Sequence, residues 1–215
     1  MTEKSGEQAE RVRRAAVKLA ALSQNGLTFA TDSYDLDRYR QIGEVATELL
    51  SVISGRTTVD LTLELGDDSG YTTPKVDVRG ALIDKNERIL LMRERSDGRW
   101  SLPGGWADPL DSPTDAVERE IREETGYGAT AVKLVACLDR DRQGHLPKFP
   151  FHVYKLFFLC HPTGDVIPAQ QLETLEIGWF GLTELPPLSM GRVHPGQLER
   201  LIAHHREPPL PTEFD

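Results

Sequence analysis

Gly104–Tyr127 reads GGWADPLDSPTDAVEREIREETGY, and this stretch decides the fold of the chain. Its second half predicts a helix over residues 113–125. Ser112 is a favoured residue at a helix N-cap, and Pro113 suits the first helical position because its missing N–H would have no partner there. Gly126 is a common residue at a helix C-terminus. Both ends of this helix are therefore predicted from local signals.

The acidic side chains of this helix fall on one face. Val117 and Ile121 are four residues apart and predict the buried face, whereas Glu120, Glu123 and Glu124 have the spacing that brings three carboxylates together. Hard oxygen ligands of this kind suit Mg²⁺ or Mn²⁺, which commonly hold substrate phosphates. The alternative is a solvated acidic face, the usual fate of glutamate runs. The glycine pair before the helix favours the metal site, because glycine lets a backbone carbonyl approach an ion.

This segment resembles the Nudix box of the Nudix hydrolases, whose pattern is G-x5-E-x7-R-E-U-x-E-E-x-G-U, with U apolar. The residues in register are Gly105, Arg119, Glu120, Ile121, Glu123, Glu124, Gly126 and Tyr127. Two positions depart from the pattern. Asp111 replaces the first glutamate of the box, and Leu110 stands where many boxes carry glycine. We expect Asp111 to weaken one contact at or near the metal without loss of the site.

The resemblance implies a role for each residue of the box. Glu120, Glu123 and Glu124 would bind Mg²⁺ or Mn²⁺ with help from the backbone carbonyl of Gly104. The metal would neutralise the diphosphate and lower the pKa of a bound water. Arg119 would orient the neighbouring carboxylate of Glu120. The alternative for Arg119 is a surface ion pair on the helix, which contributes little to stability.

Further site residues are expected outside the box. Nudix enzymes usually draw another carboxylate from a later loop, and Glu173 is the candidate here, with Glu176 as its substitute. Either Glu120 or Glu173 would be the general base. The candidates for contact with substrate are Arg93, Arg95, Trp106 and His152, with Arg140, Arg142, His145 and Lys148 as further basic residues of the following loop. Alternatively, the basic residues are solvated surface charges, Glu173 is an exposed loop residue, and Trp106 lies in the core.

The first fifty-odd residues predict a helical hairpin. Its first helix ends at Asn25-Gly26, and its second starts near Asp35 and ends at Ser54-Gly55. Residues 59–65 then alternate apolar and polar side chains, as a half-buried strand does, and residues 66–70 predict a turn.

This extension is similar to that of a Nudix subgroup whose members hydrolyse nucleoside diphosphates linked to another moiety. The likeness includes Gly26–Phe29 and Tyr34–Tyr39, and ADP-ribose and CDP-choline pyrophosphatases belong to the subgroup. Related pyrophosphatases commonly form homodimers. Because two amphipathic helices bury too little surface alone, we expect a homodimer in which residues 10–55 supply much of the contact. The expected participants are Leu49, Leu50 and Ile53.

We expect an α+β fold, a Nudix-type α/β/α sandwich around a mixed sheet, with the helical hairpin added at the N-terminus. The expected strands are 76–78, 81–83, 89–91, 131–138, 151–160 and 177–180, with a last helix over 197–205. The expected domains are a helical extension over 1–56 that serves oligomerisation or covers the substrate site, a linker with a short strand over 57–74, the Nudix domain over 75–190, and a C-terminal helix and tail over 191–215.

The composition of the chain disfavours nucleic-acid-binding, membrane-spanning and secreted proteins. The 215 residues are 39% hydrophobic and carry a net charge of −9, which disfavours bulk nucleic-acid binding. The longest uncharged apolar run, Leu156–Cys160, is far shorter than the roughly 20 residues of a membrane-spanning helix. No secretory signal is visible at the N-terminus. Cys137 and Cys160 lie in apolar runs and predict buried free thiols, so we expect a soluble cytoplasmic protein without a membrane partner.

The activity implied by the resemblance is hydrolysis of the diphosphate bond in a nucleoside diphosphate linked to another moiety, X. The products would be a nucleoside monophosphate and phospho-X, and the reaction would depend on Mg²⁺ or Mn²⁺. Two alternatives stay open. The chain is alternatively a catalytically silent module that binds nucleotides, or a pyrophosphohydrolase that processes RNA ends.

Overall fold

A computed structural model describes residues 2–65, 70–168 and 173–215. The chain forms two compact units. The helical unit comprises residues 1–74 together with the short segment 149–152, and the sheet unit comprises residues 75–148 and 153–215.

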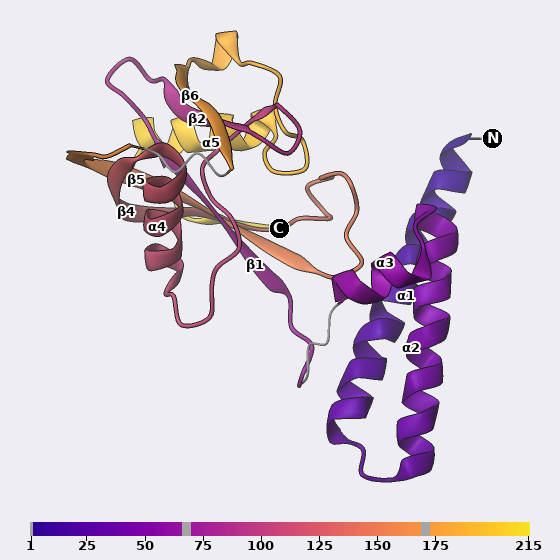
Figure 1. The fold of residues 1–215 in the computed structure, drawn as a ribbon. Coiled ribbons are helices and arrows are strands. Elements are labelled where there is room, and N and C mark those ends of the chain that lie inside the picture. Colours follow the sequence, from indigo (N-terminus) through magenta and orange to yellow (C-terminus); the bar gives the residue numbers. More distant parts are fainter. Residues whose placement is uncertain (1, 66–69, 169–172) are drawn as a thin grey trace. The chain divides into compact units, whose positions relative to one another are not determined.

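The helical unit contains the predicted hairpin. It is built from α1 (Thr2–Phe29), α2 (Ser33–Ser54) and α3 (Thr58–Leu65), with α1 and α2 side by side (Figure 1). Its small core consists of Ala16, Leu50 and Leu61. Leu50 is therefore buried within its own unit and is not available to a second subunit, contrary to our expectation.

Both helix boundaries at the tip of the hairpin differ from the prediction. α1 continues through Asn25-Gly26 because the Tyr39 ring of α2 packs directly on Gly26, where a Cβ would lie only 2.2 Å from a ring carbon. α2 begins at Ser33, earlier than predicted. Its N-cap is Asp32, whose carboxylate accepts hydrogen bonds from two backbone N–H groups of the first turn. Tertiary packing thus overrides a local stop signal.

The strand predicted over residues 59–65 is wrong, because this segment forms α3. Thr57 begins the helix: its Oγ1 accepts a hydrogen bond from the backbone N–H of Asp60 at 3.1 Å and donates one to the Asp60 carboxylate at 2.7 Å. Leu61 alone of this helix is fully buried. The turn predicted over 66–70 lies, except for its last residue, outside the described residues.

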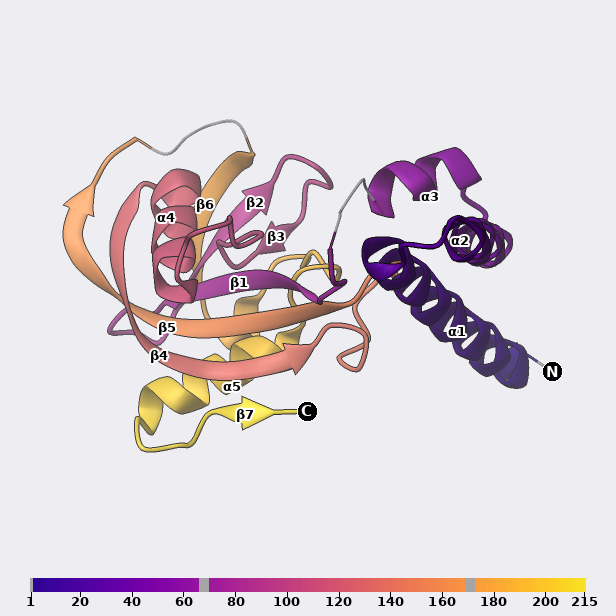
Figure 2. The same cartoon turned by 90° about the horizontal axis from the view of Figure 1, so that it is seen from below.

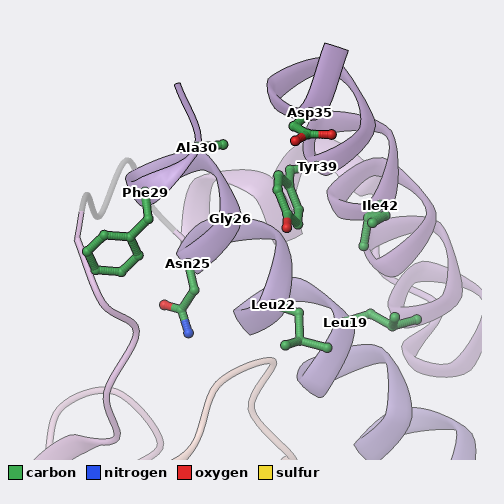
Figure 3. A pocket seen from close by; sticks show the side chains of 9 residues that line it. All are labelled: Leu19, Leu22, Asn25, Gly26, Phe29, Ala30, Asp35, Tyr39 and Ile42. Carbon is green, nitrogen blue, oxygen red and sulfur yellow. The ribbon is translucent and has the colours of Figure 1, made fainter. Parts of the chain in front are cut away.

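A cavity of about 550 Å³ opens between α1 and α2 near the tip of the hairpin (Figure 3). Its lining consists of Leu19, Leu22, Asn25, Gly26, Phe29, Ala30, Asp35, Tyr39 and Ile42. Figure 3 shows the Tyr39 side chain of α2 directed toward Gly26 of α1. The lining is mainly apolar, which favours packing over catalysis.

The sheet unit contains two sheets. The four-stranded sheet has the order β1 (Lys75–Leu82), β5 (Val153–Val166), β4 (Tyr127–Asp139) and β7 (Glu213–Phe214). The three-stranded antiparallel sheet has the order β3 (Trp100–Ser101), β2 (Ile89–Glu94) and β6 (Thr174–Phe180). Because β1 runs parallel to β5 and β5 antiparallel to β4, the larger sheet is mixed, as predicted.

Two helices cover opposite faces of the larger sheet. Figure 2 shows α4 (Pro113–Thr125) on one side and α5 (Pro195–Arg206) on the other. Val117 of α4 packs in one core with Phe158 of β5, and Leu198 of α5 packs in the other core with Phe157. Consecutive β5 residues thus serve opposite faces, which confirms the predicted α/β/α sandwich.

Some strand limits also differ from the prediction. The two short strands predicted over 76–78 and 81–83 form the single strand β1, because Gly80 continues the pairing with Phe158 of β5. β5 starts two residues later than predicted and extends to Val166. Of the two free thiols, Cys160 is buried and Cys137 is half-buried.

Among the residues that the structure describes, no helix is long and apolar enough to cross a membrane.

Candidate active site

α4 holds the acidic residues, and both of its ends are fixed as predicted. Ser112 Oγ accepts a hydrogen bond from the Asp115 backbone N–H at 3.1 Å, and the Asp115 carboxylate accepts one from the Ser112 N–H at 3.3 Å. Gly126 ends the helix in the left-handed conformation. Val117 and Ile121 have no exposed surface, so the helix cannot rotate about its axis without losing its core contacts.

The carboxylates of α4 face a cavity of about 350 Å³. Its lining consists of Gly105, Trp106, Asp108, Arg119, Glu120, Glu123, Glu124 and Glu173. Glu173 directly precedes β6, and the pairing of β6 with β2 carries it to this cavity. The backbone carbonyl of Glu173 also accepts a hydrogen bond from the Arg95 N–H at 2.8 Å. Four glutamates from two distant segments thus share one cavity.

The Arg119 guanidinium lies among acidic side chains of the cavity. It donates to Glu120 at 2.8 Å and to Asp111 at 3.1 Å, and it also contacts Glu123 at 3.4 Å and Asp108 at 3.3 Å. Charge-assisted hydrogen bonds of this kind fix the orientation of both side chains and are stronger than hydrogen bonds between neutral groups. Asp111 thus holds Arg119, which in turn holds Glu120.

Among the acidic residues that line the cavity, Glu124 is the most buried, with 7% of its surface exposed. Its carboxylate accepts a hydrogen bond from the Gly104 backbone N–H at 2.7 Å. The pKa of Glu124 is raised to about 8, chiefly by burial; Arg79 and the hydrogen bond from the Gly104 N–H oppose the rise, while Glu120 and Glu94 add to it. Burial likewise raises the pKa of Glu120, against the lowering effect of Arg119. The anionic form of both groups is therefore disfavoured unless a cation lies nearby.

Gly104 occupies a position that tolerates no side chain. Its φ of 139° lies in the region that L-residues rarely adopt, and a Cβ there would sit 2.0 Å from the carbonyl oxygen of Val78. The backbone can therefore pass between β1 and the carboxylates of α4.

Comparison with known proteins identifies this arrangement. Residues 73–201 match the NUDIX domain, and residues 8–62 match the UDP-X-like N-terminal oligomerisation domain. The chain belongs to the Nudix family. It is a Nudix pyrophosphatase, and the helical N-terminal extension predicted from the sequence is confirmed.

Several proteins resemble this Nudix chain over much of its length. It is 39% identical to the putative ADP-ribose pyrophosphatase YjhB of Bacillus subtilis over 200 residues, which cover 93% of this chain and 95% of that one. A crystal structure of an ADP-ribose pyrophosphatase from Streptococcus suis is 39% identical, with a TM-score of 0.59, and covers 66% of this chain and 100% of that one. A crystal structure of UDP-X diphosphatase is 29% identical, also with a TM-score of 0.59, and covers 96% and 99%.

The donor set of the Nudix site fits a hard divalent cation. The cavity offers carboxylate oxygens, which Mg²⁺ and Mn²⁺ prefer. Within the described ranges, however, no three His, Cys, Asp or Glu side chains converge on one point. Glu120 and Glu123 each direct one oxygen to Arg119, and Glu124 directs one oxygen to the Gly104 N–H. These contacts occupy one of the two oxygens of each carboxylate.

The structure brings together some of the predicted substrate contacts and not others. Trp106 lines the cavity and is 43% exposed. Arg93 contacts Glu176 at 3.6 Å, and neither Arg93 nor Arg95 is among the described residues of the cavity lining. His152 belongs to the helical unit. The roles of all the predicted site residues stay predictions.

Two of the basic residues predicted to contact substrate from the loop after β4 are buried instead. His145 is fully buried and bonds to the Met190 carbonyl at 2.9 Å and to Gln197 at 2.9 Å. Arg140 is buried as well and donates to the Pro147 carbonyl at 2.8 Å. These two residues fix the loop and are not available to a substrate in this conformation.

Sequence reasoning missed a group of buried ions next to the site. Asp77 and Arg79 of β1 and Lys155 of β5 are each less than a tenth exposed. Arg79 donates to both carboxylate oxygens of Asp77, at 2.9 and 2.8 Å, and Lys155 donates to the same carboxylate at 2.6 Å. A signal was present in the sequence, because opposite charges two residues apart within an apolar strand share one face.

Proposed function

We propose that this Nudix pyrophosphatase hydrolyses the diphosphate bond of a nucleoside diphosphate linked to another moiety, X, in the presence of Mg²⁺ or Mn²⁺. The products are a nucleoside monophosphate and phospho-X. The observation that carries the proposal is the single cavity shared by Glu120, Glu123, Glu124 and Glu173. The likeness over more than nine-tenths of the chain to a protein named putative ADP-ribose pyrophosphatase and to a UDP-X diphosphatase supports this substrate class.

The chain's own residues have separable tasks in this reaction. Glu120, Glu123 and Glu124 would hold the cation, with the Gly104 carbonyl beside them. A bound divalent cation supplies charge neutralisation of the diphosphate and a water of lowered pKa. In the hydrolysis, the water oxygen bonds to one phosphorus while the bridging P–O bond breaks, and the leaving phosphate keeps the electron pair.

A carboxylate of the cavity takes the proton of the attacking water. The two candidates are Glu120, which Arg119 orients, and Glu173, which reaches the same cavity from the β6 side. Trp106 offers an aromatic face on the wall of the cavity, where a nucleotide base would stack.

A substrate panel tests the proposal. ADP-ribose, CDP-choline and UDP-sugars are incubated with the full chain and either Mg²⁺ or Mn²⁺, and the products are identified by mass spectrometry in ¹⁸O-labelled water. We expect turnover of at least one compound, with one labelled monophosphate product. Absence of turnover across the panel contradicts the proposal. Tight binding of ADP-ribose without turnover would instead indicate a silent nucleotide-binding module, and turnover of RNA 5′ ends alone would indicate RNA processing.

We also propose that the helical unit forms a homodimer. The match to an oligomerisation domain supports it, and α1 carries exposed apolar side chains in support: Val12, Leu22 and Phe29 are 37%, 51% and 67% exposed. Because Leu50 is buried, Leu22 and Phe29 of α1, beside the cavity of Figure 3, join Leu49 and Ile53 as the proposed interface residues.

A further inference from the structure

The buried ions Asp77, Arg79 and Lys155 are here named the β1 ion cluster. They are not among the residues that line the cavity with Glu124, and the proposed reaction gives them no role. Asp77 and Lys155 are direct partners in the parallel pairing of β1 with β5, which places both side chains on one face. Together they carry two positive charges and one negative. Buried ions are costly to desolvate, and such a cluster is no evidence of stability. Its arrangement therefore calls for a specific role.

The guanidinium of Arg79 reaches beyond its partner Asp77. Its Nη1 donates to the Leu102 carbonyl at 3.2 Å and to Ser101 Oγ at 3.4 Å. Ser101 ends β3 and Leu102 follows it, directly before the backbone turns at Gly104. Residues 103–105 are here named the Gly104 turn. One side chain thus joins β1 to the segment that leads into the site.

Backbone hydrogen bonds hold the next residues to the same strand. The N–H of Gly80 donates to the Pro103 carbonyl at 3.0 Å, and the N–H of Val78 donates to the Gly105 carbonyl at 2.8 Å. Gly104 lies between these two attachments, and its own N–H points to Glu124. Any displacement of residues 101–103 therefore moves the donor that orients Glu124.

The geometry points to Arg79 as a positioning residue, which fixes the Gly104 turn and thereby the Glu124 carboxylate, while Asp77 and Lys155 hold the guanidinium in place. Arginine suits this task because its planar fork presents several donors in fixed directions. Two of them bind Asp77 and a third binds the segment before Gly104. A lysine keeps the positive charge but has no such fork, so it cannot hold both partners at once.

The test uses full-length Arg79→Lys, with Gln197→Met as the matched control. Gln197 is 3% exposed and bonds to His145 on the α5 side, so its replacement also disturbs a buried polar contact, but one away from the turn. Amide hydrogen exchange of Ser101, Leu102, Gly104 and Gly105 is measured in the metal-free protein. Mn²⁺ binding is measured by electron paramagnetic resonance, and kcat and KM are determined separately.

We expect Arg79→Lys to speed exchange at Gly104 by about tenfold or more and to weaken Mn²⁺ binding by a similar factor. kcat should fall while KM changes less than threefold, because Arg79 is not among the residues that line the cavity. Gln197→Met should lower the melting temperature without any of these effects. If both variants lose melting temperature alike and leave Gly104 exchange and Mn²⁺ affinity unchanged, Arg79 has only a structural role and the inference is overturned.

Asp77→Asn provides a second variant, should Arg79→Lys fail to fold. The amide keeps the size of the side chain but no longer fixes the guanidinium by charge, so we expect the same loosening of Gly104 to a smaller extent. Unchanged exchange at Gly104 in a folded Asp77→Asn protein also overturns the inference. The metal and substrate readouts rest on the proposed function, whereas the exchange readout does not, so failure of one is distinguishable from failure of the other.

Discussion

Replacement of Glu124 by glutamine is expected to remove most of the activity and at the same time to stabilise the metal-free protein. The amide keeps the shape of the side chain and can still accept the hydrogen bond from Gly104. It removes the carboxylate that would bind the cation in the proposed site. Loss of a key electrostatic group should lower kcat on the order of 10²-fold or more.

The gain in stability follows from the raised pKa of Glu124. Burial raises this pKa from 4.5 to about 8, whereas the unfolded chain keeps the lower value. Between these values the folded protein holds a proton that the unfolded chain does not, so stability falls as the pH rises, by about 1.4 kcal/mol per pH unit. At pH 7 the wild-type protein has thus lost about 3 kcal/mol relative to its stability at pH 4.5. Glutamine does not titrate and removes this loss.

Thermal unfolding in the presence of a chelator measures the effect. For a chain of this size, about 3 kcal/mol corresponds to a rise in melting temperature of roughly 6–12 °C at pH 7. The difference between variant and wild type should shrink steadily toward pH 5. Glu123→Gln is the matched control, since its carboxylate lies on the same helix but is 42% exposed.

Two results would refute this reasoning. A melting temperature unaffected by Glu124→Gln at pH 7 would mean that the carboxylate is not buried as described. Near-normal kcat with either metal would mean that the acidic face of α4 is merely solvated, and the proposed metal site would be wrong.

Three further substitutions test separate parts of the structure. Leu110 is fully exposed with a φ of 79°, so Leu110→Gly should relieve backbone strain and stabilise the protein by about 0.5–1 kcal/mol in chemical denaturation, and a loss would contradict the strain. Asp111→Glu should keep its contact with Arg119 and maintain or improve Mn²⁺ affinity; a clear drop in a metal titration of kcat/KM would show that the loop is built around the shorter side chain. Leu22→Glu should convert a homodimer to monomers in light scattering, whereas Val52→Glu, at an 84% exposed position of α2, should not; a monomeric wild type at micromolar concentration would defeat the dimer proposal.

A helix whose two ends are set by neighbouring residues could be predicted from the sequence. Ser112, Pro113 and Gly126 define α4 within the sequence itself, and the structure has the same limits. The segment 58–65 shows where such signals are ambiguous. Apolar side chains occupy every second position of residues 59–65, as in a strand, but Leu61 and Leu65 are also four residues apart, as on one face of a helix. The cap at Thr57 favours the helix.

Contacts between distant segments could not be predicted from the sequence. Glu173 reaches the cavity only because β6 pairs with β2, and the printed sequence does not specify that register. The spacing of Asp77 and Arg79 predicts that they share one face of a strand, but their charges are typical of a face exposed to solvent. They are buried because β5 supplies Lys155 as a partner, which only the parallel pairing reveals.

The position of Arg119 affects how the enzyme would respond to its ionic surroundings. A guanidinium that already offsets the charge of Glu120 and Glu123 leaves less negative charge to attract a divalent cation, so the proposed metal would bind less tightly than at a bare acidic site. Weaker binding would make the ion easier to exchange. Hydrolysis in a cell would then rise and fall with the concentration of free divalent cation.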